Sequence, residues 1–179
     1  MSKLQLEQVR KVLPFDTNNG LCIGSIKNII GENTRLKFDF NVYLPDLKKN
    51  LQRDVVWSLL QKQELILSIL KGLKLPYMAF VMNDDTDVFQ VIDGKQRLTS
   101  IIEFGNNEFP LEVDGNFYYF KDLSENATGY FKRYIIEGNV AYESNDKLIP
   151  DTYKKDWFEQ INFSGTPQDK EHLVYLNSK

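Results

Sequence analysis

The hydrophobic pattern along the chain predicts a central unit of one strand, one tight turn and one helix. Residues 88–92 form an apolar, β-branched run, which is typical of a buried strand. Asp93 and Gly94 follow as a turn, and the apolar positions between 98 and 102 have helical spacing. We expect this helix to end near Gly105.

Other segments alternate between strand and helix patterns, without an internal repeat or a low-complexity stretch. Strand patterns cover residues 35–43, 77–82, 139–143 and the arms of a hairpin within 111–120, and residues 21–30 form a strand that enters a helix. Helical patterns cover residues 4–12, 58–72, 130–134, 150–161 and 168–176. The sequence therefore predicts an α+β (mixed α/β) fold. Residues 1–44 would form an N-terminal arm and the first strands, and residues 45–179 the core of one structural domain.

Two of these segments carry local detail. In the strand pattern 35–43 the apolar residues alternate and predict one buried face, made of Leu36, Phe38, Phe40 and Val42, while residues 46–57 form a polar connection. In the helix pattern 58–72, Ser58 and Gln61 have the spacing of a capping box, and Gly72 stands where a C-terminal cap is expected. The apolar face of that helix would comprise Ile66, Ile69, Leu70 and Leu73.

Three features allow both a structural and a functional interpretation. Trp57, just before the capping box, is either a hydrophobic staple or part of a site wall. The aromatic run 117–120 could stack on bases, but no basic residue is interleaved before Lys121, which favours a place in the core. The carboxylates of the turn 83–87 could hold a divalent cation, but the loop lacks the glycine and the distal glutamate of a calcium loop, which favours a solvated hairpin tip.

Composition narrows the class of protein. With 179 residues, 42% hydrophobic and 13% aromatic, the chain can bury the core of a folded domain. The net charge of −3 gives no overall attraction to nucleic acid, so any such contact must be a local patch. Cys22 is the single cysteine, and we expect it to be a buried small hydrophobic residue. His172 is the single histidine. The absence of further cysteines and histidines argues against Ser-His-Asp and Cys-His catalytic sites and excludes zinc clusters made of several such ligands. Without a transmembrane run or signal peptide, we expect a soluble cytoplasmic protein.

The start of the central helix is the strongest candidate for chemistry. The first N–H groups of a helix lack partners, and its dipole disfavours cations there, yet Lys95 and Arg97 occupy the first turn. This mismatch predicts a bound phosphate or carboxylate. The structural alternative is that Asp93 caps the helix, Gly94 permits the turn, and Arg97 pairs with an acidic neighbour. Neither a P-loop nor a dinucleotide-binding glycine motif is present.

Three blocks of the chain resemble one family. Residues 93–99, Asp-Gly-Lys-Gln-Arg-Leu-Thr, are similar to the Asp-Gly-Gln-Gln-Arg-Leu-Thr signature of the ParB-like domain at the N-terminus of GmrSD-type modification-dependent restriction enzymes. Residues 51–57 with the following 61–76 resemble the Gln-Arg, Trp and Leu-Ile-x-Ser-Ile-Leu-x-Gly block, and residues 161–167 resemble the Asn-x-x-Gly-Thr-Pro block. The resemblance implies a compact ParB/sulfiredoxin-like domain, with a small mixed sheet flanked by helices, that binds and often hydrolyses nucleoside triphosphates to control a DNA-directed partner.

The residues and the resemblance together predict a site for a nucleoside triphosphate with Mg²⁺. The predicted catalytic residues are Asp93, Gln96 and Arg97, the phosphate ligands are Arg53, Gly94, Lys95, Arg97 and Thr99, and the supporting residues are Trp57 and Gln61. Asp93 would bind the magnesium ion or orient water. Lys95 stands where the family has Gln, so it either improves phosphate binding or displaces the water needed for hydrolysis.

Two alternatives to this Mg²⁺-dependent NTPase remain. The chain ends soon after the third block, so we expect a short stand-alone copy of the family domain without the nuclease domain, in the cytoplasm of a bacterial or phage-infected cell. Such a copy could instead be a non-catalytic regulator or anti-restriction protein that binds a DNA-processing partner. The second alternative is a DNA-binding or nicking protein with one basic surface formed by Lys48, Lys49, Arg53, Lys132 and Arg133.

Overall fold

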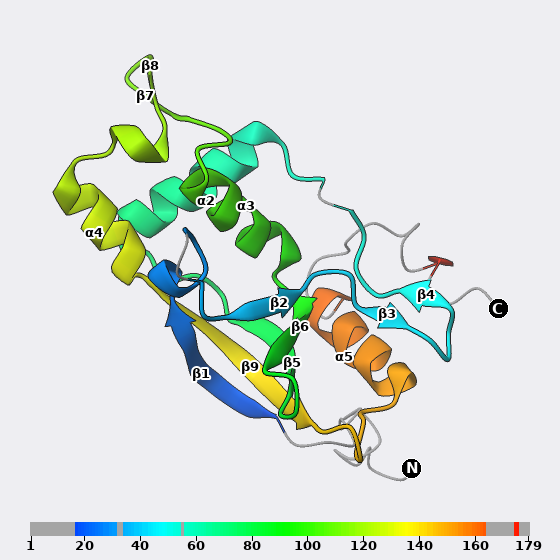
Figure 1. The fold of residues 1–179 in the computed structure, drawn as a ribbon. Coiled ribbons are helices and arrows are strands. Elements are labelled where there is room, and N and C mark those ends of the chain that lie inside the picture. The colour runs from blue at the N-terminus through cyan, green and yellow to red at the C-terminus, as the bar shows by residue number, and fades with distance from the viewer. Residues whose placement is uncertain (1–16, 32–33, 55, 164–173, 176–179) are drawn as a thin grey trace, which may run out of the picture.

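The computed structural model describes residues 17–31, 34–54, 56–163 and 174–175. Its centre is a five-stranded mixed sheet with the strand order β1-β9-β5-β6-β2 (Figure 1). These strands are β1 (Asn18–Ser25), β2 (Lys37–Asp39), β5 (Met78–Asn83), β6 (Val88–Asp93) and β9 (Ile135–Glu143). Two hairpins pair β3 (Tyr43–Leu44) with β4 (Lys49–Asn50) and β7 (Leu111–Val113) with β8 (Asn116–Tyr118). The helices are α2 (Leu59–Leu70), α3 (Lys95–Gly105), α4 (Glu125–Arg133) and α5 (Asp151–Phe163), with 3-10 helices η1 (Ile26–Asn28) and η2 (Phe120–Asp122).

This architecture confirms the predicted α+β class. Strands β1 and β2, from the first 44 residues, pair with β9 and β6 of the later chain. The predicted helical pieces 4–12 and 168–176 fall wholly or largely outside the described residues, as does His172. None of the described helices is long and apolar enough to cross a membrane.

The central strand β5 is buried on both faces of the sheet. It runs parallel to β9 and antiparallel to β6. Met78 and Phe80 enter one hydrophobic cluster, whereas Ala79 and Val81 enter the other. Because side chains alternate across a strand, a strand with both faces covered must be apolar throughout, which explains the continuous hydrophobic run.

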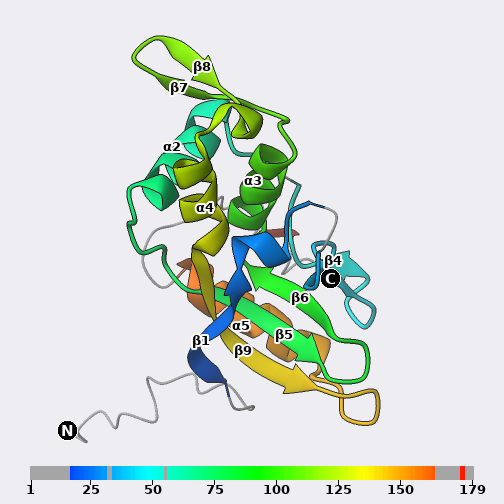
Figure 2. The ribbon, with the colours of Figure 1, turned by 60° about the vertical axis from the view of Figure 1, so that its left-hand side comes forward.

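Helices cover the two faces unequally. The larger cluster joins one face of the sheet to α2, α3 and α4, and Figure 2 shows these three helices beside one another. The smaller cluster joins the other face to α5 through Trp157 and Phe158. The sheet therefore lies between a three-helix layer and a single helix. Because helices cover its two faces, the ends of its strands are the places available for a site.

A buried ion pair fastens α5 to the sheet. The Lys154 Nζ donates to Glu143 Oε2 at 2.9 Å and to Gln90 Oε1 at 2.8 Å, and both charged side chains are less than 8% exposed. Glu143 Oε2 also accepts the backbone N–H of Ile149 at 3.1 Å. The ammonium and the carboxylate are thus satisfied together, and removing one leaves the other buried and unpaired.

Several local predictions are confirmed. Ser58 and Gln61 form the capping box of α2. Gly72 has φ +73°, and the N–H of Leu73 bonds the carbonyl of Ser68 at 3.0 Å, which is the geometry of a Schellman cap. Asp114 and Gly115 both have positive φ between β7 and β8, as a tight hairpin turn requires.

The prediction of one long strand over 35–43 is wrong. Strand β2 has only three residues, because the Asp39 carboxylate accepts the N–H of Asn41 at 2.9 Å and the chain turns there. Phe38 packs against the larger cluster, whereas Val42 belongs to the smaller one, so the alternating residues do not share one face. The predicted polar connection 46–57 contains β4.

Three predictions of burial are also wrong. Phe117 and Tyr118 are 61% and 40% exposed, because the β7-β8 hairpin projects from the helical layer (Figure 1) and only Phe120 of this aromatic run reaches the core. Cys22 is exposed, since it lies on the edge strand β1. Leu73 is 54% exposed, because α2 ends at Leu70.

The turn between β5 and β6 is held by hydrogen bonds of its own. Asn83 Oδ1 accepts the N–H groups of Asp85 and Thr86, and the Asp85 carboxylate accepts the N–H of Asn145 at 2.6 Å. The three aspartates of this hairpin tip are exposed. Among the described residues, no group of three His, Cys, Asp or Glu side chains could hold a metal ion.

The ion pair of α5 yields a stability prediction. In Lys154→Met, the free energy of unfolding should fall by about 3 kcal/mol or more, because the Glu143 carboxylate stays buried without its counter-charge. Lys155→Met is a matched control on the same helix, because its ion pair with Glu159 is more exposed and should change stability by less than about 1 kcal/mol. Urea unfolding measures both, and equal losses would contradict the assignment.

Candidate functional site

The turn between β6 and α3 requires glycine. Gly94 has φ +109° and forms the N-cap of α3. A Cβ at this position would lie 2.8 Å from Cγ and Sδ of Met78 on the neighbouring strand. The glycine therefore allows α3 to begin directly above the end of β6 and the start of β5, in close contact with Met78.

Asp93 and Arg97 form an ion pair across this turn. The Arg97 guanidinium donates to Asp93 Oδ2 at 2.7 Å and to the carbonyl oxygen of Pro76 at 2.5 Å. The predicted pairing of Arg97 with an acidic neighbour is confirmed, whereas the predicted cap is wrong, because no side chain caps α3. Arg97 thereby links the end of β6 to the segment that enters β5.

The Gln96 side chain holds the segment that precedes α2. Its Oε1 accepts the N–H groups of Val56 and Trp57 at 3.0 and 3.2 Å, and its Nε2 donates to the carbonyl of Asp54 at 3.0 Å. An amide that bonds three backbone groups is fixed in orientation. The arrangement makes Gln96 the clamp between α3 and this segment.

Lys95 is a buried cation. It is 7% exposed, and its Nζ makes a long hydrogen bond of 3.4 Å to Asn41 Oδ1. Within the described residues, no carboxylate lies within 4.0 Å of this ammonium. Burying an ammonium beside a single neutral acceptor is costly, so the site favours an anion next to Lys95.

These groups meet in a cleft of about 770 Å³. The polar residues that line it, with glycine, are Gln52, Arg53, Asp93, Gly94, Lys95, Gln96, Arg97 and Asn162. The hydrophobic residues that line it are Trp57, Leu65, Leu75, Pro76, Tyr77, Phe158 and Ile161. Clefts of this size and mixed character are typical of small-molecule sites.

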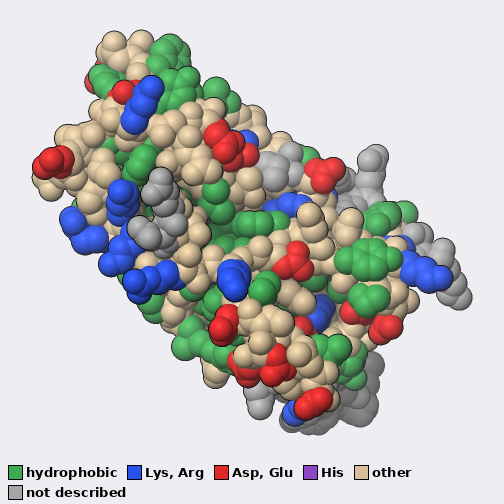
Figure 3. Space-filling model, in the orientation of Figure 1, with side chains coloured by type: hydrophobic (Ala, Val, Ile, Leu, Met, Phe, Trp, Pro, Cys, Tyr) green, Lys and Arg blue, Asp and Glu red, His purple; other side chains and the backbone are tan. Residues whose placement is uncertain are grey.

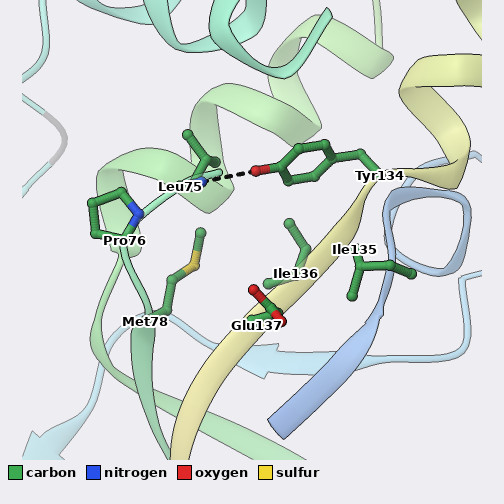
Figure 4. A pocket seen from close by; sticks show the side chains of 7 residues that line it. All are labelled: Leu75, Pro76, Met78, Tyr134, Ile135, Ile136 and Glu137. Atoms are coloured by element: carbon green, nitrogen blue, oxygen red, sulfur yellow. Dashed lines mark hydrogen bonds between the residues drawn. The ribbon is translucent and has the colours of Figure 1, made fainter. Parts of the chain in front are cut away.

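The wall formed by residues 73–77 is held by Tyr134, the residue between α4 and β9. The Tyr134 hydroxyl accepts the N–H of Leu75 at 2.9 Å, drawn in Figure 4, and donates to the carbonyl of Leu73 at 2.9 Å. Burial raises the pKa of the Tyr134 phenol above its ordinary value, so the donor stays protonated at neutral pH. The adjoining cavity of about 10 Å³ is no larger than one water molecule. This cavity is too small for a ligand, and the residues around it serve to hold the wall of the cleft.

The family model described as "GmrSD restriction endonuclease, N-terminal domain" matches residues 26–175. The chain belongs to this family. The membership confirms the resemblance carried by the three sequence blocks, and it associates this GmrSD N-terminal domain with restriction-related DNA processing. No curated protein and no solved structure gives a match.

The GmrSD N-terminal domain brings most of the predicted site residues together. Arg53, Trp57 and the whole 93–97 segment line the cleft. Gln61 and Thr99 are not among the lining residues, because the amide of Gln61 bonds the N–H of Ser58 at 2.9 Å in the capping box and Thr99 lies further along α3.

Sequence reasoning missed the opposite wall. Phe158 and Asn162 come from α5, and Tyr77 from the connection before β5. Asn162 lies in the third family block, and this block was the sequence signal that could have placed it in the site. No sequence signal marked Tyr77 and Phe158, because an apolar residue beside a site has the same pattern as one in the core.

The predicted single basic surface is wrong. Lys48 and Lys49 lie at the β3-β4 hairpin, whereas Lys132 and Arg133 end α4 on the opposite side of the molecule (Figure 1). Arg53 lines the cleft. The domain therefore carries these cations in separate places.

The clamp made by Gln96 gives a local prediction. In Gln96→Ala, hydrogen exchange at the Val56 and Trp57 amides should accelerate by about tenfold, because their acceptor is lost. Thr99→Ala on the same helix serves as control and should leave those amides unchanged. Hydrogen exchange by mass spectrometry or NMR measures the effect, and equal protection in all three proteins would contradict the clamp.

Proposed function

We propose that the cleft binds a nucleoside triphosphate and hydrolyses it in support of restriction-related DNA processing. The observation that carries the proposal is the buried ammonium of Lys95 at the N-terminus of α3, in a cleft that also holds Arg97 and Arg53. Three cations facing one cleft on a chain with net charge −3 favour a compact polyanion.

The backbone supports the same ligand. Within the described residues, the N–H groups of Lys95, Gln96 and Arg97 have no hydrogen-bond acceptor in the protein. Gly94 itself lines the cleft, directly before these three residues. A phosphate at this position would accept from these amides and benefit from the helix dipole.

The aromatic residues of the cleft suit the base and sugar. Trp57, Tyr77 and Phe158 line the same cleft as the cations, and Tyr77 is 42% exposed. Aromatic faces bind bases by stacking and tolerate different bases. The cleft thus offers both charged and aromatic side chains, as a nucleotide requires.

Asp93 is the acidic group of the proposed site. Among the described residues that line the cleft, it is the one carboxylate. A single carboxylate fits Mg²⁺ that is bound mainly by phosphate oxygens, so Asp93 would hold the ion, and the ion would neutralise phosphate charge. Asp93 must then exchange its bond with Arg97 for the new partner, which leaves the guanidinium free to bind phosphate.

A second candidate function is a non-catalytic regulator with the same fold. It is favoured by one observation, that the amide of Gln96 and the guanidinium of Arg97 are already bonded to protein groups. In that case the 93–97 segment stabilises the fold, and partner binding should not depend on Asp93 or Arg97.

Calorimetry with ATP, GTP, CTP and UTP tests the binding site. Arg97→Ala should weaken nucleotide binding by about tenfold or more, because a charge-assisted hydrogen bond to phosphate is lost. Lys147→Ala also removes one positive charge, at an exposed position outside the cleft, and should bind like the wild type. Absence of binding in the wild type, or equal binding in all three proteins, would exclude this site.

The role of Asp93 is tested by Asp93→Asn, measured with and without Mg²⁺. Without the ion, nucleotide should bind the variant more tightly, because the repulsion between carboxylate and phosphate is removed. With the ion, the wild type should bind nucleotide more tightly and release phosphate, whereas the variant should do neither. An identical response to Mg²⁺ in both proteins would contradict the assignment.

A further inference from the structure

A second group of cations lies outside the cleft. Lys132 and Arg133 form the last turn of α4, and Lys27 belongs to η1, which packs against α4. The N–H of Arg35 bonds the carbonyl of Asn28 at 2.9 Å, which places Arg35 beside η1. Figure 3 shows Lys and Arg side chains gathered over α4 and η1.

Lys121 extends this group toward the β7-β8 hairpin. The Lys132 Nζ lies 5.7 Å from the centre of the Phe120 ring, so α4 and η2 adjoin. Lys121 follows Phe120 in the chain, and its Nζ lies 5.8 Å from the centre of the Tyr119 ring. We call the set Lys27, Arg35, Lys121, Lys132 and Arg133 the basic stripe.

The stripe is exposed and lacks acidic partners within the described part of the chain. All five side chains are exposed, and no described carboxylate lies within 4.0 Å of their charged groups. Unpaired cations that gather on an acidic chain create a local positive field, which attracts a polyanion by charge complementarity.

The β7-β8 hairpin adds aromatic faces at one end of the stripe. Phe117 is 61% exposed and Tyr118 is 40% exposed, although large aromatic side chains usually enter the core. The pairing of the hairpin strands leaves both residues on a projecting arm (Figure 2). Exposed aromatics beside cations are the elements with which proteins bind single-stranded nucleic acid, since bases stack and phosphates pair.

We propose that the basic stripe and the β7-β8 hairpin bind single-stranded nucleic acid, with bases stacked on Phe117 and Tyr118, one on each face of β8, and phosphates along the stripe. This surface is separate from the cleft, and the proposal does not rest on nucleotide binding there. A duplex offers phosphates but keeps its bases stacked inside, so it would lose the contribution of the hairpin.

Fluorescence anisotropy with a labelled thymidine 20-mer tests the proposal on the full chain. The logarithm of the affinity should fall linearly with the logarithm of salt concentration, with a slope of about −3 to −4 for five phosphate contacts. Lys132→Glu combined with Arg133→Glu should weaken binding by about tenfold or more and flatten that slope. Phe117→Ala combined with Tyr118→Ala should weaken binding by about tenfold and leave the slope unchanged.

Matched controls locate the site. Lys48→Glu combined with Lys147→Glu reverses two exposed charges elsewhere and should reduce binding far less than the stripe variant. The substituted side chains are exposed, so circular dichroism should show wild-type folding in every variant. Four results would overturn the proposal: no binding at low salt, equal losses in the stripe and control variants, a duplex that binds as tightly as the single strand, or competition by polyglutamate equal to that by the oligonucleotide.

Discussion

The close approach of Gly94 to Met78 is the contact on which the rest of the site depends. With no Cβ at position 94, β6 can pair with β5 to its end and α3 can begin at once, in the left-handed backbone conformation that glycine tolerates. The helix N-terminus then lies at the edge of the sheet where β6 ends. The position of Lys95, Gln96 and Arg97 follows directly, because they are the first residues of that helix.

The other walls of the cleft are held by side chains that bond backbone. Gln96 fixes the segment before α2, Gln52 Nε2 donates to the carbonyls of Val91 and Ile92, and Tyr134 bonds the 73–77 connection twice. Two irregular segments, the connection from β4 to α2 and the connection 73–77, thereby gain the rigidity of neighbouring strands and helices. A site built from loops can keep its geometry in this way, since each loop has fixed partners.

The distribution of charge separates two kinds of surface on one acidic chain. Lys95 is buried and lines a cleft of limited volume, which favours a small anion. The cations of α4 and η1 are exposed and spread along the surface, which suits an extended polymer. The net charge of the chain indicates neither the cleft nor the basic stripe, because it sums all charges, whereas binding depends on where the charges lie relative to one another.

The sequence by itself determined the elements whose signals are local: the capping box of α2, the Asp-Gly hairpin, the β6-α3 turn, and through three motif blocks the family. Only the tertiary structure decided which residues meet. In the folded chain Tyr77 and Phe158 line the cleft, and Phe117 is exposed. The strand predicted over 35–43 is limited to residues 37–39. The physical reason is that periodicity records whether a residue is apolar, whereas burial and contact depend on which distant segment packs against it.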